Sequence, residues 1–246
     1  TSLSFTAADI VGPTMVITST TSGVSSGSST NDSSINLTFT ANEAATGFVV
    51  GDITVTGGSL SSFATVSSTV YTATFTPSGA GAKTIDVAAN KFTDAAGNNN
   101  SAATQFTWTY DNVNPTLASS SPADNATGVA VDANIVLTFS ENVAKGSGNI
   151  TLYKTDSTLV QTIDVNSGLV TVSGTGVTIN PTANLDSAQG YYLHIAATAF
   201  DDAVGNSYAG INNSSTLNFI SVDTVNPTLL STSPADNATG VAVGAN

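Results

Sequence analysis

Acidic side chains are the residues of this chain best suited to chemistry, because they greatly outnumber the basic ones. The 246 residues include 17 Asp and Glu, four Lys, no Arg, no Cys and one His, which gives a formal charge of −13. Clustered carboxylates repel one another, and a hard divalent cation relieves that repulsion. Composition therefore favours cation binding, and it excludes thiolate metal sites, disulfides and the basic surface that nucleic acid requires.

The acidic residues recur at equivalent places in an internal repeat. The pattern DxVxPT begins at Asp9, Asp111 and Asp223, with spacings of 102 and 112 residues, and FxDAxGN occurs at 92–98 and 200–206. After the last two copies of DxVxPT the match continues, differing at only four of 24 positions. The spacing is close to the ~100 residues of an immunoglobulin-like sandwich, which predicts a tandem array.

Period-two alternation and turn-rich connections predict strands throughout the repeats. Residues 35–39, 70–75 and 106–110 alternate in polarity and are rich in β-branched and aromatic side chains. Clusters of Gly, Ser and Asn separate these segments, and no useful helical stripe appears. We therefore predict an all-β fold of tandem immunoglobulin-like β-sandwiches. Tyr191 or Tyr192 should form a tyrosine corner at the start of the sixth strand of the second repeat.

The repeat boundaries predict four segments. Residues 1–9 would be the last strand of a preceding Ig-like unit, residues 10–111 and 112–223 two Ig-like domains, and residues 224–246 the start of a further unit. The start of the sequence lacks a basic region followed by an apolar stretch, and no apolar run approaches the ~20 residues that cross a bilayer. We expect an internal piece of a longer chain, without membrane insertion.

Longer motifs carry a family resemblance. The second repeat contains NPTLASSSPADNATGVAVDANIVLTFSENV, INPTANLDSAQGYYLHI and a closing TLNF. It resembles the bacterial Ig-like domain of surface-layer proteins and large secreted adhesins. The first repeat contains GDITVTGGSLSSF, YTATFTPSGAG and TQFTWTYD, and it looks like a sister family found in tandem in giant surface proteins. The resemblance implies an extracellular or cell-surface bacterial setting.

The topology of such a sandwich brings distant acidic residues together. The loops after the second and sixth strands lie at the end where the chain enters the domain. In the first repeat this rule groups Asp9, just before the domain, with Glu43, after the second strand, and Asp94, in the FxDAxGN loop. A cation that accepts irregular oxygen coordination, as Ca²⁺ does, fits a site assembled in this way.

The second repeat supplies equivalent candidate ligands. They are Asp111, Glu141 and Asp202, joined by Asp201, while Asp223 begins the third copy. Oxygens of neighbouring asparagines are plausible additions to a site with six to eight ligands, namely those of Asn98, Asn112, Asn114 and Asn206. Similar tandem Ig-like adhesins hold calcium at interdomain linkers through linker and loop aspartates, so the resemblance implies Ca²⁺ as well.

Each aspartate also has an interpretation without metal. The Asp of DxVxPT can cap a turn before proline, and the Asp of DAxGN can form an Asx-turn with Gly97 or Gly205 at positive φ. The glutamates are spaced differently, since Glu43 lies four residues after its LTF motif and Glu141 only two. The sequence leaves the ligand set open, with the glutamates as its least secure members.

Catalysis is not expected. His194 lies between the apolar Leu193 and Ile195 on a predicted strand and should face away from the core as an ordinary polar residue. No GxSxG motif occurs. The adjacent Asp201 and Asp202 give no sign of the separation of about 5 to 9.5 Å that glycoside hydrolysis needs.

Three functions remain. The leading hypothesis is a structural stalk or spacer of a large surface or secreted adhesin, with calcium at the interdomain junctions making the array rigid. The alternative is a self-assembling filament or surface-layer subunit, in which edge strands or residues 223–246 pair with another chain. The third is a module that binds surface glycans. Aromatic residues are only 7% of the chain, and Trp108 shares its parity with Phe106 and Tyr110, which predicts a core position.

Overall fold

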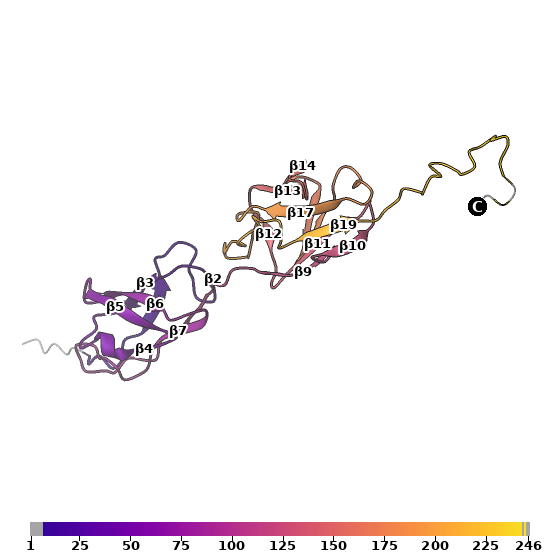
Figure 1. Ribbon diagram of the computed structural model, residues 1–246. Coiled ribbons are helices and arrows are strands. Elements are labelled where there is room, and N and C mark those ends of the chain that lie inside the picture. Colours follow the sequence, from indigo (N-terminus) through magenta and orange to yellow (C-terminus); the bar gives the residue numbers. More distant parts are fainter. Residues whose placement is uncertain (1–6, 243, 245–246) are drawn as a thin grey trace, which may run out of the picture. The chain divides into compact units, whose positions relative to one another are not determined.

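The computed structural model describes residues 7–242 and residue 244, which divide into two compact units. The first unit comprises the chain up to Pro115 together with Asp201–Tyr208, and the second comprises Thr116–Phe200 and the residues from Ala209 onward. Apart from one 3-10 helix, η1 (Val50–Asp52), the regular elements of the described residues are strands (Figure 1). None of the described helices is long and apolar enough to span a membrane.

The first unit is a sandwich of two four-stranded sheets. Their orders are β1-β3-β6-β5 and β2-β8-β7-β4, which is the arrangement of an immunoglobulin fold with a short extra edge strand, β2. The strands are β1 (Met15–Ser19), β2 (Ser29–Thr30), β3 (Ile35–Ala41), β4 (Ile53–Thr56), β5 (Gly58–Thr65), β6 (Val70–Pro77), β7 (Gly81–Val87) and β8 (Phe106–Tyr110).

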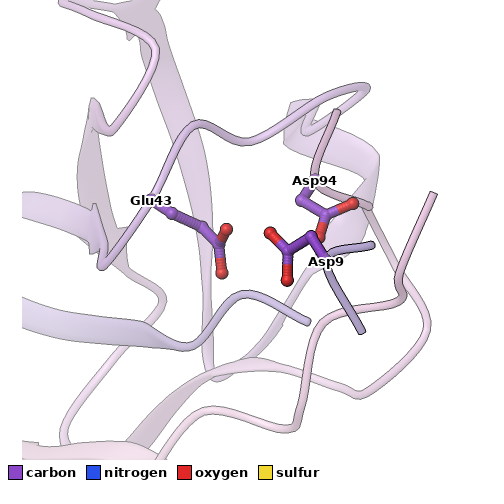
Figure 2. A group of neighbouring side chains, drawn as sticks. All are labelled: Asp9, Glu43 and Asp94. Atoms are coloured by element: carbon purple, nitrogen blue, oxygen red, sulfur yellow. The ribbon is translucent and has the colours of Figure 1, made fainter. Parts of the chain in front are cut away.

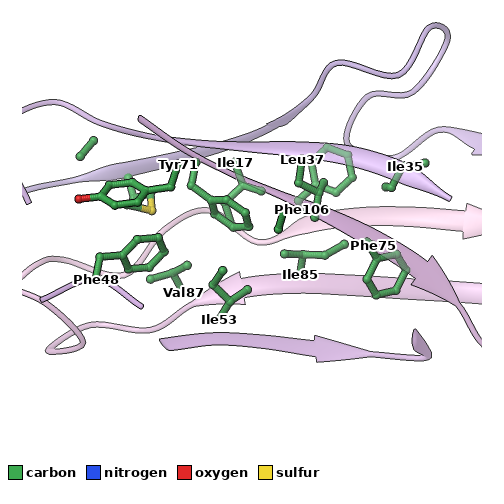
Figure 3. Packing of buried hydrophobic residues seen from close by; sticks show 14 of the residues in the cluster. Ile17, Ile35, Leu37, Phe48, Ile53, Tyr71, Phe75, Ile85, Val87 and Phe106 are labelled. Carbon is green, nitrogen blue, oxygen red and sulfur yellow. The ribbon is translucent and has the colours of Figure 1, made fainter. Parts of the chain in front are cut away.

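The core of the first unit lies between these sheets and follows the alternation of the sequence. Along β3, Ile35, Leu37 and Phe39 are buried. Figure 3 shows Ile35 and Leu37 facing buried residues of the opposite sheet such as Ile85. Trp108 is only 1% exposed, and its indole Nε1 donates to the hydroxyl oxygen of Thr30 at 3.1 Å. The predicted core position of the single tryptophan is therefore confirmed.

The second unit is built in the same way, with one more strand in its two main sheets. Its sheets have the orders β15-β16-β11-β9 and β10-β19-β17-β13-β14, and a short β12-β18 pair accompanies them. The strands are β9 (Leu117–Ser121), β10 (Ala126–Val129), β11 (Ile135–Phe139), β12 (Ala144–Lys145), β13 (Asn149–Lys154), β14 (Leu159–Asp164), β15 (Val170–Ser173), β16 (Gly176–Ile179), β17 (Gly190–Ile195), β18 (Phe200–Asp201) and β19 (Asn218–Ser221). The prediction of tandem Ig-like β-sandwiches is thus confirmed.

Strand β17 carries two of the features predicted from the sequence. The hydroxyl oxygen of buried Tyr191 accepts a hydrogen bond from the backbone N–H of Asp186 at 2.7 Å, so Tyr191 is the residue of the tyrosine corner. Leu193 and Ile195 are buried, whereas His194 is half-buried on the outer face of the sheet. The expected outward direction of His194 is therefore confirmed.

The two terminal segments of the predicted domain plan stay predictions. Residues 1–6, most of the expected last strand of a preceding unit, lie outside the described residues, and residues 7–9 have no strand assigned. The described part of residues 224–246, expected to begin a further unit, carries no assigned strand either.

Candidate metal centre

Three carboxylates from distant parts of the sequence meet in the first unit. Asp9, Glu43 and Asp94 each offer one carboxylate oxygen, and these oxygens all lie within 4.8 Å of one another. Figure 2 shows the side chains of Glu43 and Asp9 pointing toward each other, with Asp94 beside Asp9. Like charges this close repel one another. The group therefore favours the binding of a cation.

Asp94 is the most enclosed member of this group, with 3% of its surface exposed. Its Oδ2 accepts a hydrogen bond from the side-chain amide of Asn98 at 2.7 Å, and its Oδ1 accepts one from the Asn98 backbone N–H at 2.8 Å. The side-chain bond is the main reason that the pKa of Asp94 lies below its ordinary value of 3.8, although burial opposes the shift. Asp94 is therefore ionised at neutral pH.

Asp9 is fixed by a turn and by the same asparagine. Its Oδ1 accepts the backbone N–H of Val11 at 3.1 Å, as in an Asx-turn. The side-chain amide of Asn98 also donates to the backbone carbonyl of Asp9 at 3.1 Å. The turn uses one oxygen of the Asp9 carboxylate and leaves the other for a ligand. The turn interpretation and the metal interpretation of Asp9 are thus compatible.

The linker segment, residues 9–14, packs closely on the FxDAxGN loop. The backbone N–H of Ser101 donates to the carbonyl of Pro13 at 3.0 Å. A Cβ atom on Gly12 would lie 1.9 Å from the carbonyl oxygen of Asn99, so any side chain at position 12 would push the two segments apart. The glycine therefore permits the approach that places Asp9 beside Asp94.

Two hydrogen-bonded residue pairs position Glu43 in the loop after β3. Asn42 and Thr14 bond to each other twice, through the Thr14 N–H to the Asn42 side-chain oxygen (2.7 Å) and the Asn42 N–H to the Thr14 carbonyl (3.1 Å). Farther along the loop, Thr46 and Thr93 exchange backbone hydrogen bonds of 2.7 and 3.1 Å. These pairings hold the loop between the linker segment and the residue that precedes Asp94.

The second repeat reproduces this arrangement. Asp111 and Asp202 also offer carboxylate oxygens within 4.8 Å of each other. The side-chain amide of Asn206 donates to Asp202 Oδ2 at 2.8 Å and to the Asp111 carbonyl at 3.1 Å, and its backbone N–H donates to Asp202 Oδ1 at 2.8 Å. Asp111 also forms the same turn, accepting the N–H of Val113 at 3.1 Å.

The structure also explains why the two glutamates are spaced differently in the sequence. Ser140 exchanges two hydrogen bonds with Thr116, as Asn42 does with Thr14. Each glutamate directly follows this pairing residue, so Glu43 and Glu141 are equivalent. Strand β3 continues two residues beyond its LTF motif, to Ala41, whereas β11 ends with that motif. The longer strand accounts for the longer spacing.

Two further predicted ligands lie outside both groups, among the described residues. Asp201 accepts a hydrogen bond from the Ser207 hydroxyl. Asp223 accepts bonds from the Ser187 hydroxyl at 3.1 Å and the Val225 N–H at 2.9 Å, which is the DxVxPT turn again.

The asparagines act differently from the expectation of the sequence analysis. Asn98 and Asn206 use their amide N–H groups to hold aspartates, a role that sequence reasoning missed because it considered only their oxygens. The sequence signal that could have indicated this role is that both asparagines occupy the same position of FxDAxGN, one in each repeat. Asn112 and Asn114 are exposed.

Comparisons with known proteins agree with the observed fold. Two models, each described as a bacterial Ig-like domain, match residues 9–110 and residues 111–220. No curated protein matches the chain.

Solved structures that resemble the chain do so weakly. They include InvD of Yersinia pseudotuberculosis (16% identity, 88% of this chain and 60% of that chain, TM-score 0.32), the adhesin InvE of the same organism (18%, 82% and 59%, 0.29) and CopC from Methylosinus trichosporium OB3b (13%, 46% and 99%, 0.30). The chain thus spans about three-fifths of the InvD and InvE structures. The two matched stretches and the two sandwiches show that the chain belongs to the bacterial Ig-like domain family and contains two such domains in tandem.

Proposed function

We propose that this chain is a stalk segment of a bacterial cell-surface or secreted adhesin, in which Ca²⁺ fixes each linker segment to the domain that follows it. The main support is the occurrence, in both repeats, of a linker aspartate whose carboxylate lies beside that of a loop aspartate. In each repeat one asparagine joins the linker aspartate to the loop aspartate. A surface or extracellular setting accords with the family and with millimolar calcium outside cells.

The donor set supports calcium over zinc or copper. All of the grouped side chains are carboxylates, and the described residues place no histidine or cysteine with them. Hard oxygen donors suit Ca²⁺, whereas zinc and copper prefer nitrogen or sulfur ligands. No lysine of the described chain is recorded in an ion pair with Asp9, Glu43 or Asp94. Carbonyl oxygens and water would complete the coordination.

Calcium would act on the connection between domains through the linker aspartate. Asp9 and Asp111 lie at the starts of the two matched stretches, 9–110 and 111–220. A connection of this kind is mobile by default unless something holds it. An ion shared between the linker aspartate and two loops of the following domain removes freedom from the linker itself. We therefore assign the sites a stiffening role.

Calorimetric titration of the metal-free chain with CaCl₂ tests the proposal. We expect two sites with dissociation constants of about 10⁻⁴ to 10⁻³ M, the range of extracellular modules. Asp94→Asn and Asp202→Asn should each abolish one site, and the double variant should abolish both. Asp86→Asn on β7 and Asp132→Asn remove the same charge outside the two groups and should retain both sites. Unchanged binding in the double variant would refute the assignment.

A further inference from the structure

The second domain contains a shallow pocket unrelated to the acidic groups. Its cavity is about 450 Å³ and is lined by residues of β13, of β17 and of the segment 209–212. This segment runs antiparallel to the end of β17, where Ile195 and Ile211 form an isolated bridge. A Cβ atom on Gly210 would lie 2.4 Å from the carbonyl oxygen of Ile195, so glycine permits this close pairing. The volume falls within the ~300–1,000 Å³ of small-molecule sites.

The lining of this pocket combines polar side chains with small apolar ones. Two side-chain amides, one hydroxyl and one imidazole supply both hydrogen-bond donors and acceptors, from Asn149, Asn212, Thr151 and His194. The apolar part consists of the small side chains of Ala196, Ala197 and Ala209, while the core residues Ile195 and Ile211 border the pocket. Neither a carboxylate nor a lysine lines the pocket. Such a lining suits a neutral ligand that carries hydroxyl or amide groups and one apolar face.

His194 is held in place by two tyrosine rings. Its ring centroid lies 5.1 Å from that of Tyr153 and 5.2 Å from that of Tyr192. The two tyrosines are cross-strand partners, and their rings stack at 5.2 Å with an interplanar angle of 12°. Aromatic contacts of this kind limit the rotamers of the histidine. The imidazole is therefore preorganised at the edge of the pocket.

We infer that this pocket binds a neutral saccharide carrying an acetamido group, such as an N-acetylhexosamine. The methyl of the acetamido group would pack on the alanine-rich wall, while its N–H and C=O groups and the sugar hydroxyls would bond to the amides, Thr151 and His194. A formal charge of −13 disfavours anionic sugars, which restricts the ligand to the neutral class. The inference is independent of calcium, since the pocket contains no carboxylate.

The test is titration of the full chain with N-acetyl-D-glucosamine in EDTA, followed by amide chemical shifts. We expect saturable shifts confined to the pocket residues, with a dissociation constant of about 1 mM, typical of a ligand of this size. D-Glucose, which lacks the acetamido group, and N-acetylneuraminic acid, which is anionic, should each bind more weakly. No saturable shift at the pocket, or equal binding of all three sugars, would overturn the inference.

Two substitutions at exposed positions separate specific binding from a general effect on folding. Ala197→Trp should fill the cavity and reduce affinity at least tenfold, whereas Ala130→Trp places the same side chain on an exposed position outside the pocket and should leave affinity unchanged. Asn212→Ala removes one amide without filling the space and should weaken binding several-fold. Retained affinity in Ala197→Trp would place binding elsewhere and contradict the inference.

Discussion

At the residue scale, one asparagine in each domain organises two aspartates. The side-chain amide of Asn98 contacts both the Asp94 carboxylate and the Asp9 carbonyl, and Asn206 does the same for Asp202 and Asp111. Charge-assisted hydrogen bonds of this kind stabilise the ionised carboxylate and orient its remaining lone pairs. The proposed calcium site is therefore shaped by an asparagine amide donor as well as by the carboxylates.

The lowered pKa of Asp94 predicts a pH dependence for the first domain. A carboxyl whose pKa is lower folded than unfolded stabilises the fold above the unfolded value, and this contribution disappears as pH falls through the folded value. Since the folded pKa of Asp94 lies below 3.8, the loss should occur in acid below about pH 4. In EDTA, a carbon-13 titration of the Asp94 carboxyl should show this, and Asn98→Ala should raise the pKa. An unshifted pKa in that variant would contradict the assigned cause.

Sequence patterns identified the aspartates of the candidate site more readily than its other residues. The motifs DxVxPT and FxDAxGN indicated Asp9, Asp94, Asp111 and Asp202, because each motif is also a turn with a defined backbone. The equivalence of the glutamates depends on where β3 and β11 end, which strand patterns locate poorly. The asparagine donors depend on side-chain direction, which the spacing of residues does not encode.

At the element scale, the approach of the linker segment to the FxDAxGN loop depends on Gly12. Gly12→Ala should destabilise the first domain by about 1 to 3 kcal/mol, because the added Cβ meets the backbone oxygen of Asn99. It should also weaken calcium binding at the first site, since Asp9 would move away from Asp94. Thermal unfolding and calorimetry measure both effects.

A matched glycine is available as the control for this substitution. A Cβ atom on Gly51, in η1, meets nothing within 4 Å. Gly51→Ala should therefore leave both stability and calcium affinity close to those of the unchanged chain. Equal behaviour of the two alanine variants would show that the contact at Gly12 does not position the linker.

The tyrosine corner makes a second prediction at this scale. Tyr191→Phe removes the acceptor of the Asp186 N–H and should cost about 1 to 3 kcal/mol in urea unfolding of the second domain. Tyr192→Phe is the natural comparison, because its hydroxyl makes only a 3.4 Å contact with the Ser157 hydroxyl, and it should cost less than about 0.5 kcal/mol. A larger loss for Tyr192→Phe would contradict the assignment of the corner.

At the scale of the whole molecule, the proposed role of calcium concerns the connections between domains. Small-angle scattering in 5 mM CaCl₂ should give a larger and more narrowly distributed maximum dimension than scattering in EDTA, because bound ions restrict the linker. The double variant Asp94→Asn with Asp202→Asn should give the EDTA profile under both conditions, while Asp86→Asn should respond as the unchanged chain does. Identical scattering profiles with and without calcium would contradict the proposal that calcium stiffens the linkers.

The repeat plan was the part of the whole molecule that the sequence predicted best. Recurring motifs revealed the two sandwiches, because each repeat must bury its own core and therefore carries a full set of alternating strands. The pocket beside His194 was not predicted, since it arises where residues 209–212 lie beside the end of β17. Such a contact is a property of tertiary packing and leaves no periodic signal.

The contact between Asn98 and the Asp9 carbonyl has a consequence for a chain under tension. A pulling force that reaches the domain through its linker loads this bond and the Ser101–Pro13 bond before it loads the five paired residues of β1. The linker should then peel away first, lengthening the molecule while the sandwich stays folded, and it should rejoin when the force is released. Each linker segment would thus extend reversibly under load and protect the folded domain that follows it.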